Sequence, residues 1–193
     1  MAKRKGNAKK RKEIKKRNKR AAKQGKIKSQ GKIRSKIHKS KGELKEFIVI
    51  GSDHAGLKLK RFVKFLLMRR GLNIVDVGVF SEKPADYPDI ASKVALIVLA
   101  YKTRGILICK TGVGMCIAAN RHKGIRAVNA YDTLTARMSR EHNDSNVLCL
   151  RGEGIPNETI EKIVDVWLKT KFSNKKRHIR RIKKIDALCR NKK

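Results

Sequence analysis

Residues 109–114 (CKTGVG) place a thiol directly before a glycine-rich turn. The apolar residues 106–108 predict a buried strand before the thiol, and the small residues up to Asn120 predict a helix after the turn. This order points backbone N–H groups outward from the amino end of the helix, where they suit a phosphate or a charge that develops during a reaction. The same helix end would lower the pKa of a neighbouring thiol, so Cys109 is a candidate reactive thiolate. A buried Cys beside an ordinary turn would have the same local sequence.

Further polar residues stand next to other predicted strands. Asp53 and His54 follow the strand predicted at 47–50, and residues 142–144 (HND) precede the strand predicted at 146–150. Taken singly, each is readily explained as a turn residue, a helix cap or a solvated loop residue. Taken together, an acid, two His and a thiol are expected to share one rim of the sheet, which is the arrangement of an active site.

Apolar runs and helical spacings alternate along the chain from Phe47 onward. Strands are predicted at 47–50, 73–77, 105–109, 125–128 and 146–150. Helices are predicted at 57–70, 90–100, 112–121, 133–141, 156–170 and 175–191, with 78–88 as a loop. This pattern predicts an α/β fold with a doubly wound five-stranded parallel sheet, Rossmann-like and three-layered (α/β/α). Ligands bind such sheets at the carboxyl ends of the strands, near the point where strand order reverses.

The first 46 residues differ in composition from the remainder. They hold 21 Lys and Arg against three Glu, no aromatic residue and few apolar ones, so about half of the net charge of +35 lies there. We therefore predict a disordered basic extension over 1–46 and one folded domain over 47–193. The charge favours non-specific binding of RNA or another polyanion, with a solvated tail as the alternative; a mitochondrial transit peptide fits poorly.

The four Cys residues form no C-x-x-C pair, and no secretory signal precedes them. This predicts reduced thiols in the cytoplasm. No apolar run is long enough to span a bilayer, so no membrane span is expected. The Cys and His spacings fit no metal site, and the chain lacks G-x-G-x-x-G and Walker motifs, so we expect neither a metal nor a nucleotide cofactor.

Six short motifs occur in order between Phe47 and Leu188: 51–56 (GSDHAG), 86–88 (DYP), 109–114 (CKTGVG), 118–120 (AAN), 124–128 (GIRAV) and 139–144 (SREHND). Together they resemble the type B ribose-5-phosphate isomerases, a family that includes the galactose-6-phosphate isomerase subunits. The resemblance implies a cofactor-independent aldose–ketose isomerase that interconverts ribose 5-phosphate and ribulose 5-phosphate in the pentose phosphate pathway.

The resemblance also implies residue roles. Cys109 matches the base that removes the proton from carbon-2, giving an enediolate, and Asp53 and Thr111 are candidates for moving hydroxyl protons. His142 matches the residue that opens the furanose ring. The remaining expected contacts to substrate are the backbone at Gly112, Val113 and Gly114, the sugar-lining Tyr87 and Asn143, and the phosphate-binding His54, Arg177 and Arg181. By resemblance, two chains form a homodimer and share each site.

Two positions depart from the family pattern. Lys110 stands where many relatives carry Gly, so it would be strained if that position needs a positive φ, or it could favour the Cys109 thiolate. Glu153 stands where relatives commonly have a phosphate-binding Arg, and would repel a phosphate unless Arg151 has taken over. The alternatives to the ribose 5-phosphate reaction are galactose-6-phosphate isomerase activity and a catalytically silent phosphosugar-binding or RNA-associated protein.

Overall fold

The computed structural model describes residues 47–188, which fold around one parallel sheet. The strands are β1 (Phe47–Ser52), β2 (Asn73–Asp76), β3 (Arg104–Cys109), β4 (Ala127–Asn129) and β5 (Val147–Arg151). The helices are α2 (Leu57–Arg69), α3 (Tyr87–Tyr101), α4 (Val113–Ala119), α5 (Thr133–Asn143), α6 (Asn157–Lys169) and α7 (Lys176–Leu188). The predicted five-stranded parallel α/β fold is confirmed.

The strands lie side by side in the order β2-β1-β3-β5-β4. Every pairing is parallel; β3 lies between β1, where Ile50 pairs with Ile106, and β5, where Ile106 pairs with Leu148. From β1 the chain moves outward to β2 and then returns past β1 to β3. The reversal of strand order therefore lies between β1 and β3, and the loops that follow these two strands border the position where such sheets bind ligands.

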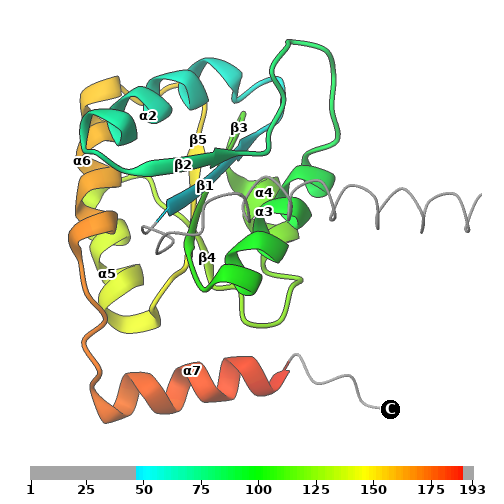
Figure 1. Cartoon of the computed structure of the whole chain (residues 1–193). Helices are drawn as coiled ribbons and strands as arrows, with labels where there is room; N and C mark the ends of the chain where they lie inside the picture. Colours follow the sequence, from blue (N-terminus) through cyan, green and yellow to red (C-terminus); the bar gives the residue numbers. More distant parts are fainter. Residues whose placement is uncertain (1–46, 189–193) are drawn as a thin grey trace, which may run out of the picture. The chain divides into compact units, whose positions relative to one another are not determined.

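Helices cover both faces of the sheet (Figure 1). On one face α2, α5 and α6 enclose the main hydrophobic core, in which apolar side chains of β1, β3 and β5 meet the fully buried Trp167 of α6. On the other face α3 and α4 pack against each other and against the sheet. Because both faces are covered, the central strands are mostly apolar and buried, as in β3, where residues 105–109 are all buried.

The last helix, α7, differs from the others because it extends away from the sheet (Figure 1). It packs chiefly on α5. Six of its side chains are Lys or Arg, and His178 is its only buried residue. Apolar side chains on α7 remain partly or largely exposed, including Ile185 and Leu188. A single described chain thus leaves much of this amphipathic helix without a hydrophobic partner.

The main differences from the predicted elements lie at helix boundaries. Helix α3 begins at Tyr87 and not at residue 90, because Asp86 has an extended backbone and Pro88 fits the first turn of a helix. Helix α4 ends at Ala119, and α7 is described only as far as Leu188. The predicted extension 1–46, including its disorder, lies outside the described residues. Within 47–188, no helix is long and apolar enough to cross a membrane.

Candidate active site at the carboxyl end of the sheet

The turn after β3 is built around the thiol of Cys109. This side chain is 5% exposed, and its Sγ accepts a hydrogen bond from the backbone N–H of Gly112 at 3.1 Å. Gly112 has a φ of +78°, and a β-carbon added there would lie 2.4 Å from Oδ1 of Asn129. Only glycine satisfies both the backbone conformation and the available space. The glycine therefore allows its own N–H group to face the sulfur.

The loop after β1 brings Asp53 to the same end of the sheet. Asp53 is 6% exposed, and its Oδ1 accepts the backbone N–H of Gly56 at 2.9 Å. A β-carbon on Gly56 would lie 2.4 Å from the carbonyl oxygen of Ile108, so this loop packs directly on the end of β3. The carboxylate and the Cys109 thiol are thus held by two loops in backbone contact.

A third loop closes this end of the sheet. The backbone N–H of Gly152, just after β5, donates to the carbonyl oxygen of Cys109 at 2.8 Å. A β-carbon on Gly152 would lie 3.2 Å from the carbonyl oxygen of Ala55, so the loop also touches the one that carries Asp53. Backbone hydrogen bonds and close approaches, which do not depend on flexible side chains, fix the geometry here.

Other predicted residues surround this centre. The exposed His54 accepts the backbone N–H of Ala85 at its Nδ1, at 3.3 Å, which links the first loop to the segment before α3. The Tyr87 ring lies over the start of α4, since a β-carbon on Gly114 would be 2.8 Å from it. Thr111 is exposed, and its Oγ1 accepts the N–H of Val113 at 3.3 Å. The structure therefore gathers the predicted residues of the β1, β3 and α3 segments at one end.

Asn129, at the end of β4, was missed by the sequence reasoning. Its Nδ2 donates to the carbonyl oxygen of Thr111 at 3.2 Å and to the Tyr131 hydroxyl at 3.0 Å. Its Oδ1 is buried and has no hydrogen-bond partner among the described residues. A polar residue directly after a short strand is the same signal that identified Asp53. The strand predicted at 125–128 already places Asn129 directly after it, but the sequence reasoning did not apply the signal there; the observed strand, Ala127–Asn129, ends at this residue.

The other thiols near this site differ from Cys109 in their surroundings. A hydrogen bond with Cys149 lowers the pKa of Cys116. The pKa of Cys149 is raised, mainly by burial and secondly by the same hydrogen bond. The Cys116 Sγ contacts the carbonyl oxygen of Ala127 and the side chain of Asn120. Cys116 is therefore a residue of α4 whose thiol is in contact with Ala127 and Asn120, whereas Cys109 ends β3 at the glycine-rich turn. All three described cysteines are free thiols.

Lys110 and Glu153, the two residues that depart from the family pattern, lie close to each other at this end of the sheet. The Nζ of Lys110 lies 3.8 Å from Oε2 of Glu153, and both side chains are largely exposed, at 71% and 59%. Lys110 is not among the residues with positive φ, so its side chain causes no backbone strain. The carboxylate that would repel a phosphate is thus paired with a cation. Arg151, which could replace the missing Arg, lies against Gly154.

His142 and Asn143 lie at the opposite end of the sheet, so the expectation that they share a rim with Cys109 is wrong for a single chain. Both end α5, just before β5, where the N–H of Gly105 at the start of β3 donates to the carbonyl oxygen of Asn146. From Gly105 to Cys109 the strand rises about 13 Å. A helix that returns between parallel strands must end beside their amino ends, and the sequence reasoning overlooked this direction.

Ionic contacts hold the end of α5. Asp144 has a left-handed φ of +47° and accepts Arg126 Nη2 at 2.9 Å and Arg140 Nη1 at 2.7 Å. Burial lowers the pKa of Arg140, and the Asp144 carboxylate acts against that change. Arg140 also donates to the carbonyl oxygen of Ser145. These contacts fix the backbone that carries His142.

Helix α7 carries the predicted phosphate-binding residues to the same amino end. The rings of His142 and His178 are 4.3 Å apart, and the N–H of Ser173 donates to the carbonyl oxygen of Glu141 at 3.0 Å. Arg177 and Arg181 are both exposed. The structure therefore brings His142 and Arg177 together through His178, but separates them from Cys109. In the described residues, no three His, Cys, Asp or Glu side chains are grouped to hold a metal ion.

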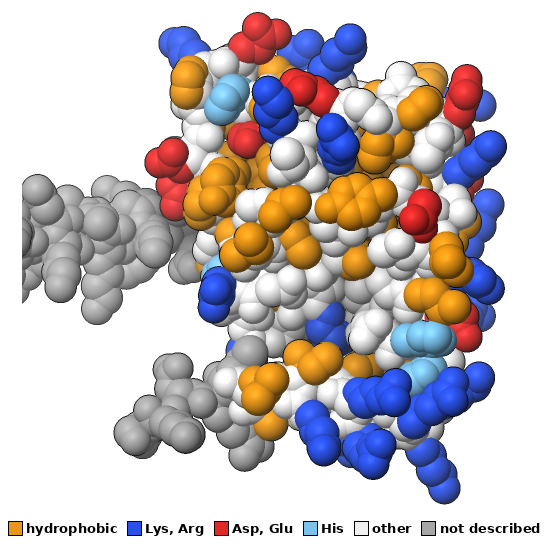
Figure 2. Space-filling model, turned by 180° about the vertical axis from the view of Figure 1, so that it is seen from behind, with side chains coloured by type: hydrophobic (Ala, Val, Ile, Leu, Met, Phe, Trp, Pro, Cys, Tyr) orange, Lys and Arg blue, Asp and Glu red, His pale blue; other side chains and the backbone are white. Residues whose placement is uncertain are grey.

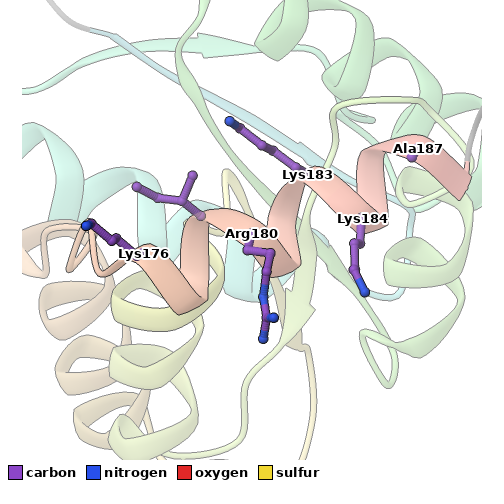
Figure 3. Close-up of a pocket in the computed structure, with 6 residues that line it drawn as sticks. Lys176, Arg180, Lys183, Lys184 and Ala187 are labelled. Atoms are coloured by element: carbon purple, nitrogen blue, oxygen red, sulfur yellow. The ribbon is translucent and has the colours of Figure 1, made fainter.

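A shallow pocket follows a different face of α7 (Figure 3). It is lined by Lys176, Ile179, Arg180, Lys183, Lys184 and Ala187. Lys176 and Lys183 project to one side of the helix, and Arg180 and Lys184 project to the other. All four cations are exposed, and none has an acidic partner within residues 47–188. Arg177 and Arg181 are not part of this lining, so α7 presents two separate sets of cations.

The chain is similar to known proteins over almost all of its described part. The family profile named Ribose/Galactose Isomerase matches residues 48–185. Ribose-5-phosphate isomerase B of Escherichia coli is 42% identical over 142 residues, which cover 73% of this chain and 95% of that protein. A solved ribose 5-phosphate isomerase of Thermotoga maritima is 45% identical with a TM-score of 0.72, covering 74% of this chain and 99% of the other. Ribose-5-phosphate isomerase B of Mycoplasma genitalium, solved with bound ribulose-5-phosphate, is 41% identical, with a TM-score of 0.72 and coverage of 76% and 98%.

Proposed function

We propose that this chain, which belongs to the Ribose/Galactose Isomerase family and is a sugar-phosphate isomerase, interconverts ribose 5-phosphate and ribulose 5-phosphate. One observation carries the proposal: the buried Cys109 thiol accepts the Gly112 N–H where β3 ends, beside the buried Asp53. A relative that is 41% identical has been solved with ribulose-5-phosphate bound, which favours the five-carbon sugar.

In the proposed reaction the Cys109 thiolate takes the proton from carbon-2 of the open-chain aldose. The electron pair forms the carbon–carbon double bond of an enediolate, whose negative oxygen is stabilised by backbone N–H groups of the turn at 111–114. Asp53 and Thr111 move a proton from the carbon-2 oxygen to the carbon-1 oxygen. Cys109 then returns its proton to carbon-1, so that an aldehyde and an alcohol become an alcohol and a ketone with no net change in composition.

We further propose that each site is shared between two chains. In one chain His142 and Arg177 are at the other end of the sheet from Cys109, so the proposed ring-opening and phosphate-binding groups must come from a second copy. The rim near Cys109 also exposes large apolar side chains: Tyr87, Val113, Ile117, Tyr131 and Leu134. Figure 2 shows hydrophobic side chains gathered on one face of the folded domain, above α7 in this view. Covering them with a partner would remove apolar surface from water.

Substrate turnover by the purified chain tests the reaction. Ribose 5-phosphate and galactose 6-phosphate are supplied separately, and ketose formation is followed at equal enzyme concentration. We expect a kcat/KM at least about a hundredfold higher for the five-carbon sugar, because a closed site that fits one chain length excludes a longer one. A preference for galactose 6-phosphate would contradict the substrate assignment, and no turnover of either sugar would contradict the proposed reaction.

A second proposal concerns the basic extension. We propose that residues 1–46 bind the phosphate backbone of RNA without sequence preference, since they carry 21 Lys and Arg and no aromatic residue on which bases could stack. The exposed cations that line the α7 pocket add to the positive surface of the folded part (Figures 2 and 3). Residues 1–46 lie outside the described part of the chain, and a cytoplasmic location likewise stays a prediction.

A further inference from the structure

His178 is a polar side chain in a place where an apolar one would be expected. It is 2% exposed and lies where α7 packs on the end of α5. Most buried contacts between two amphipathic helices are made by aliphatic side chains. A buried imidazole requires hydrogen-bond partners for its nitrogens, and here both nitrogens have one.

The partners of His178 fix its protonation. The Arg177 Nε, which can only donate, lies 3.1 Å from Nε2 of His178, so Nε2 accepts. The proton of the neutral ring is then on Nδ1, which donates to Oγ of Ser173 at 2.7 Å. We assign this tautomer from the partners. A doubly protonated ring would place an N–H against the N–H of Arg177, so this arrangement requires a neutral His178.

The same ring connects two residues of the proposed site. Its hydrogen bond uses one donor of Arg177 and leaves the terminal nitrogens of the guanidinium to face a phosphate in the fork geometry that such groups prefer. The ring also contacts the ring of His142, with centroids 4.3 Å apart and the two planes tilted by 46°. Ser173, its other partner, is tied to α5 through the carbonyl oxygen of Glu141.

We propose that His178 is a positioning residue that, in its neutral form, orients Arg177 toward the substrate phosphate and holds α7 against His142. This inference rests on the proposed function, in which Arg177 binds the phosphate and His142 opens the sugar ring. His178 itself touches no reacting atom.

The surroundings keep His178 neutral. Burial lowers its pKa first, followed by the charges of His142, Arg177, Arg181 and Lys175. The acidic group nearby is Glu141, whose Oε1 lies 3.9 Å from Nε2 of His142. Because the folded-state pKa is lowered, the neutral ring and its contribution to docking are complete above about pH 6.5 and are lost as the pH falls through the lowered pKa.

Two variants separate hydrogen bonding from packing. His178→Phe keeps a buried planar ring but removes both nitrogens, and His178→Gln supplies a carbonyl acceptor that never becomes charged. At pH 8 we expect His178→Phe to raise KM for ribose 5-phosphate, and the inhibition constant of inorganic phosphate, about tenfold with little change in kcat. His178→Gln is expected to recover most of this loss.

The pH dependence of KM distinguishes a neutral His178 that orients Arg177 from a side chain that only fills space, because a purely structural role would leave this dependence unchanged. The substrate phosphate also titrates near pH 6, so wild type is compared with His178→Gln at each pH. We expect KM to rise more steeply in wild type than in His178→Gln between pH 8 and pH 5.5. Equal pH profiles would overturn the requirement for a neutral ring.

Arg177→Ala distinguishes the inference from the function on which it rests. If Arg177→Ala raises KM while His178→Phe, with an unchanged melting temperature, leaves it unchanged, the role of His178 is overturned alone. If Arg177→Ala leaves KM unchanged, the assignment of Arg177 to the phosphate fails, and the role of His178 fails with it. A raised KM in both variants, with ribose 5-phosphate still turned over, supports the proposal.

Discussion

At the carboxyl end of the sheet backbone contacts hold the functional residues, whereas at the amino end charged and aromatic side chains hold them. Around Cys109 the contacts come from Gly112, Gly56 and Gly152, each approached closely by another segment. Around His142 they come from Arg140, Asp144 and His178. Backbone contacts are insensitive to pH, while the side-chain contacts depend on protonation and on where α7 lies. The geometry at the carboxyl end is therefore set mainly by the backbone, and the geometry at the amino end is set mainly by side-chain charge and ring contacts.

The largest effect is expected from Cys109→Ala, which removes the proposed base from the carboxyl end. Turnover should fall by about 10²- to 10⁴-fold, the usual contribution of a positioned acid or base. The fold should persist, because the turn is held by backbone contacts. Activity and melting temperature are measured together with those of Cys116→Ala, a neighbouring thiol outside the proposed chemistry. Loss of activity in the Cys116 variant alone would contradict the assignment.

Mixing two inactive variants tests whether the two ends meet between chains. Cys109→Ala chains keep an intact amino end, and His142→Ala chains keep an intact carboxyl end. If chains recombine at random into symmetric dimers, about a quarter of the sites contain both intact ends. Co-expression with two different tags should therefore restore about a quarter of wild-type turnover. No recovery, with mixed dimers shown by sequential tag purification, would mean that the ends do not meet.

Removal of residues 1–46 tests whether the function of the carboxyl or the amino end of the sheet depends on the extension. The family match begins at residue 48, and relatives of nearly the same length as the matched part are complete without it. We expect kcat and KM to stay within about twofold of the full-length values. In a plot of the logarithm of the RNA-binding constant against the logarithm of the salt concentration, the slope should become shallower by about 0.7 for each phosphate contact that is lost. A shuffled extension of equal composition serves as the control and should restore the slope. An unchanged slope without residues 1–46 would contradict the RNA proposal.

The smallest effect is expected from the exposed pair at the carboxyl end. An exposed pair contributes about 0–1 kcal/mol, so Glu153→Gln should lower KM, and Lys110→Gln should raise it, by less than about fivefold. The opposite directions follow from the charge that each variant leaves facing a phosphorylated substrate. Steady-state kinetics at two salt concentrations check this, because screening should reduce both effects. A tenfold change in either variant would show that this pair binds substrate directly.

The parallel α/β fold and most of the carboxyl-end site could be predicted from the sequence alone. Strand periodicity located β1, β3 and β5, and the residues that directly follow a strand must lie at its carboxyl end. Asp53, Thr111 and Cys109 could therefore be placed at the same edge of the sheet from local information alone. The glycine at position 112 likewise has a local cause, its left-handed φ.

The arrangement at the amino end could not be predicted in this way, because it depends on how the elements pack together. Strand order fixed the β1/β3 reversal, and the direction of α5 carried His142 and Asn143 about a strand's length away from Cys109. Lys110 pairs with Glu153, and Asn129 contacts Thr111, although the members of each pair are far apart in the sequence. The burial of His178 likewise depends on how α7 packs and has no local sequence signal. Hydrophobic periodicity reports which face of an element is buried, but it does not report which other element covers that face.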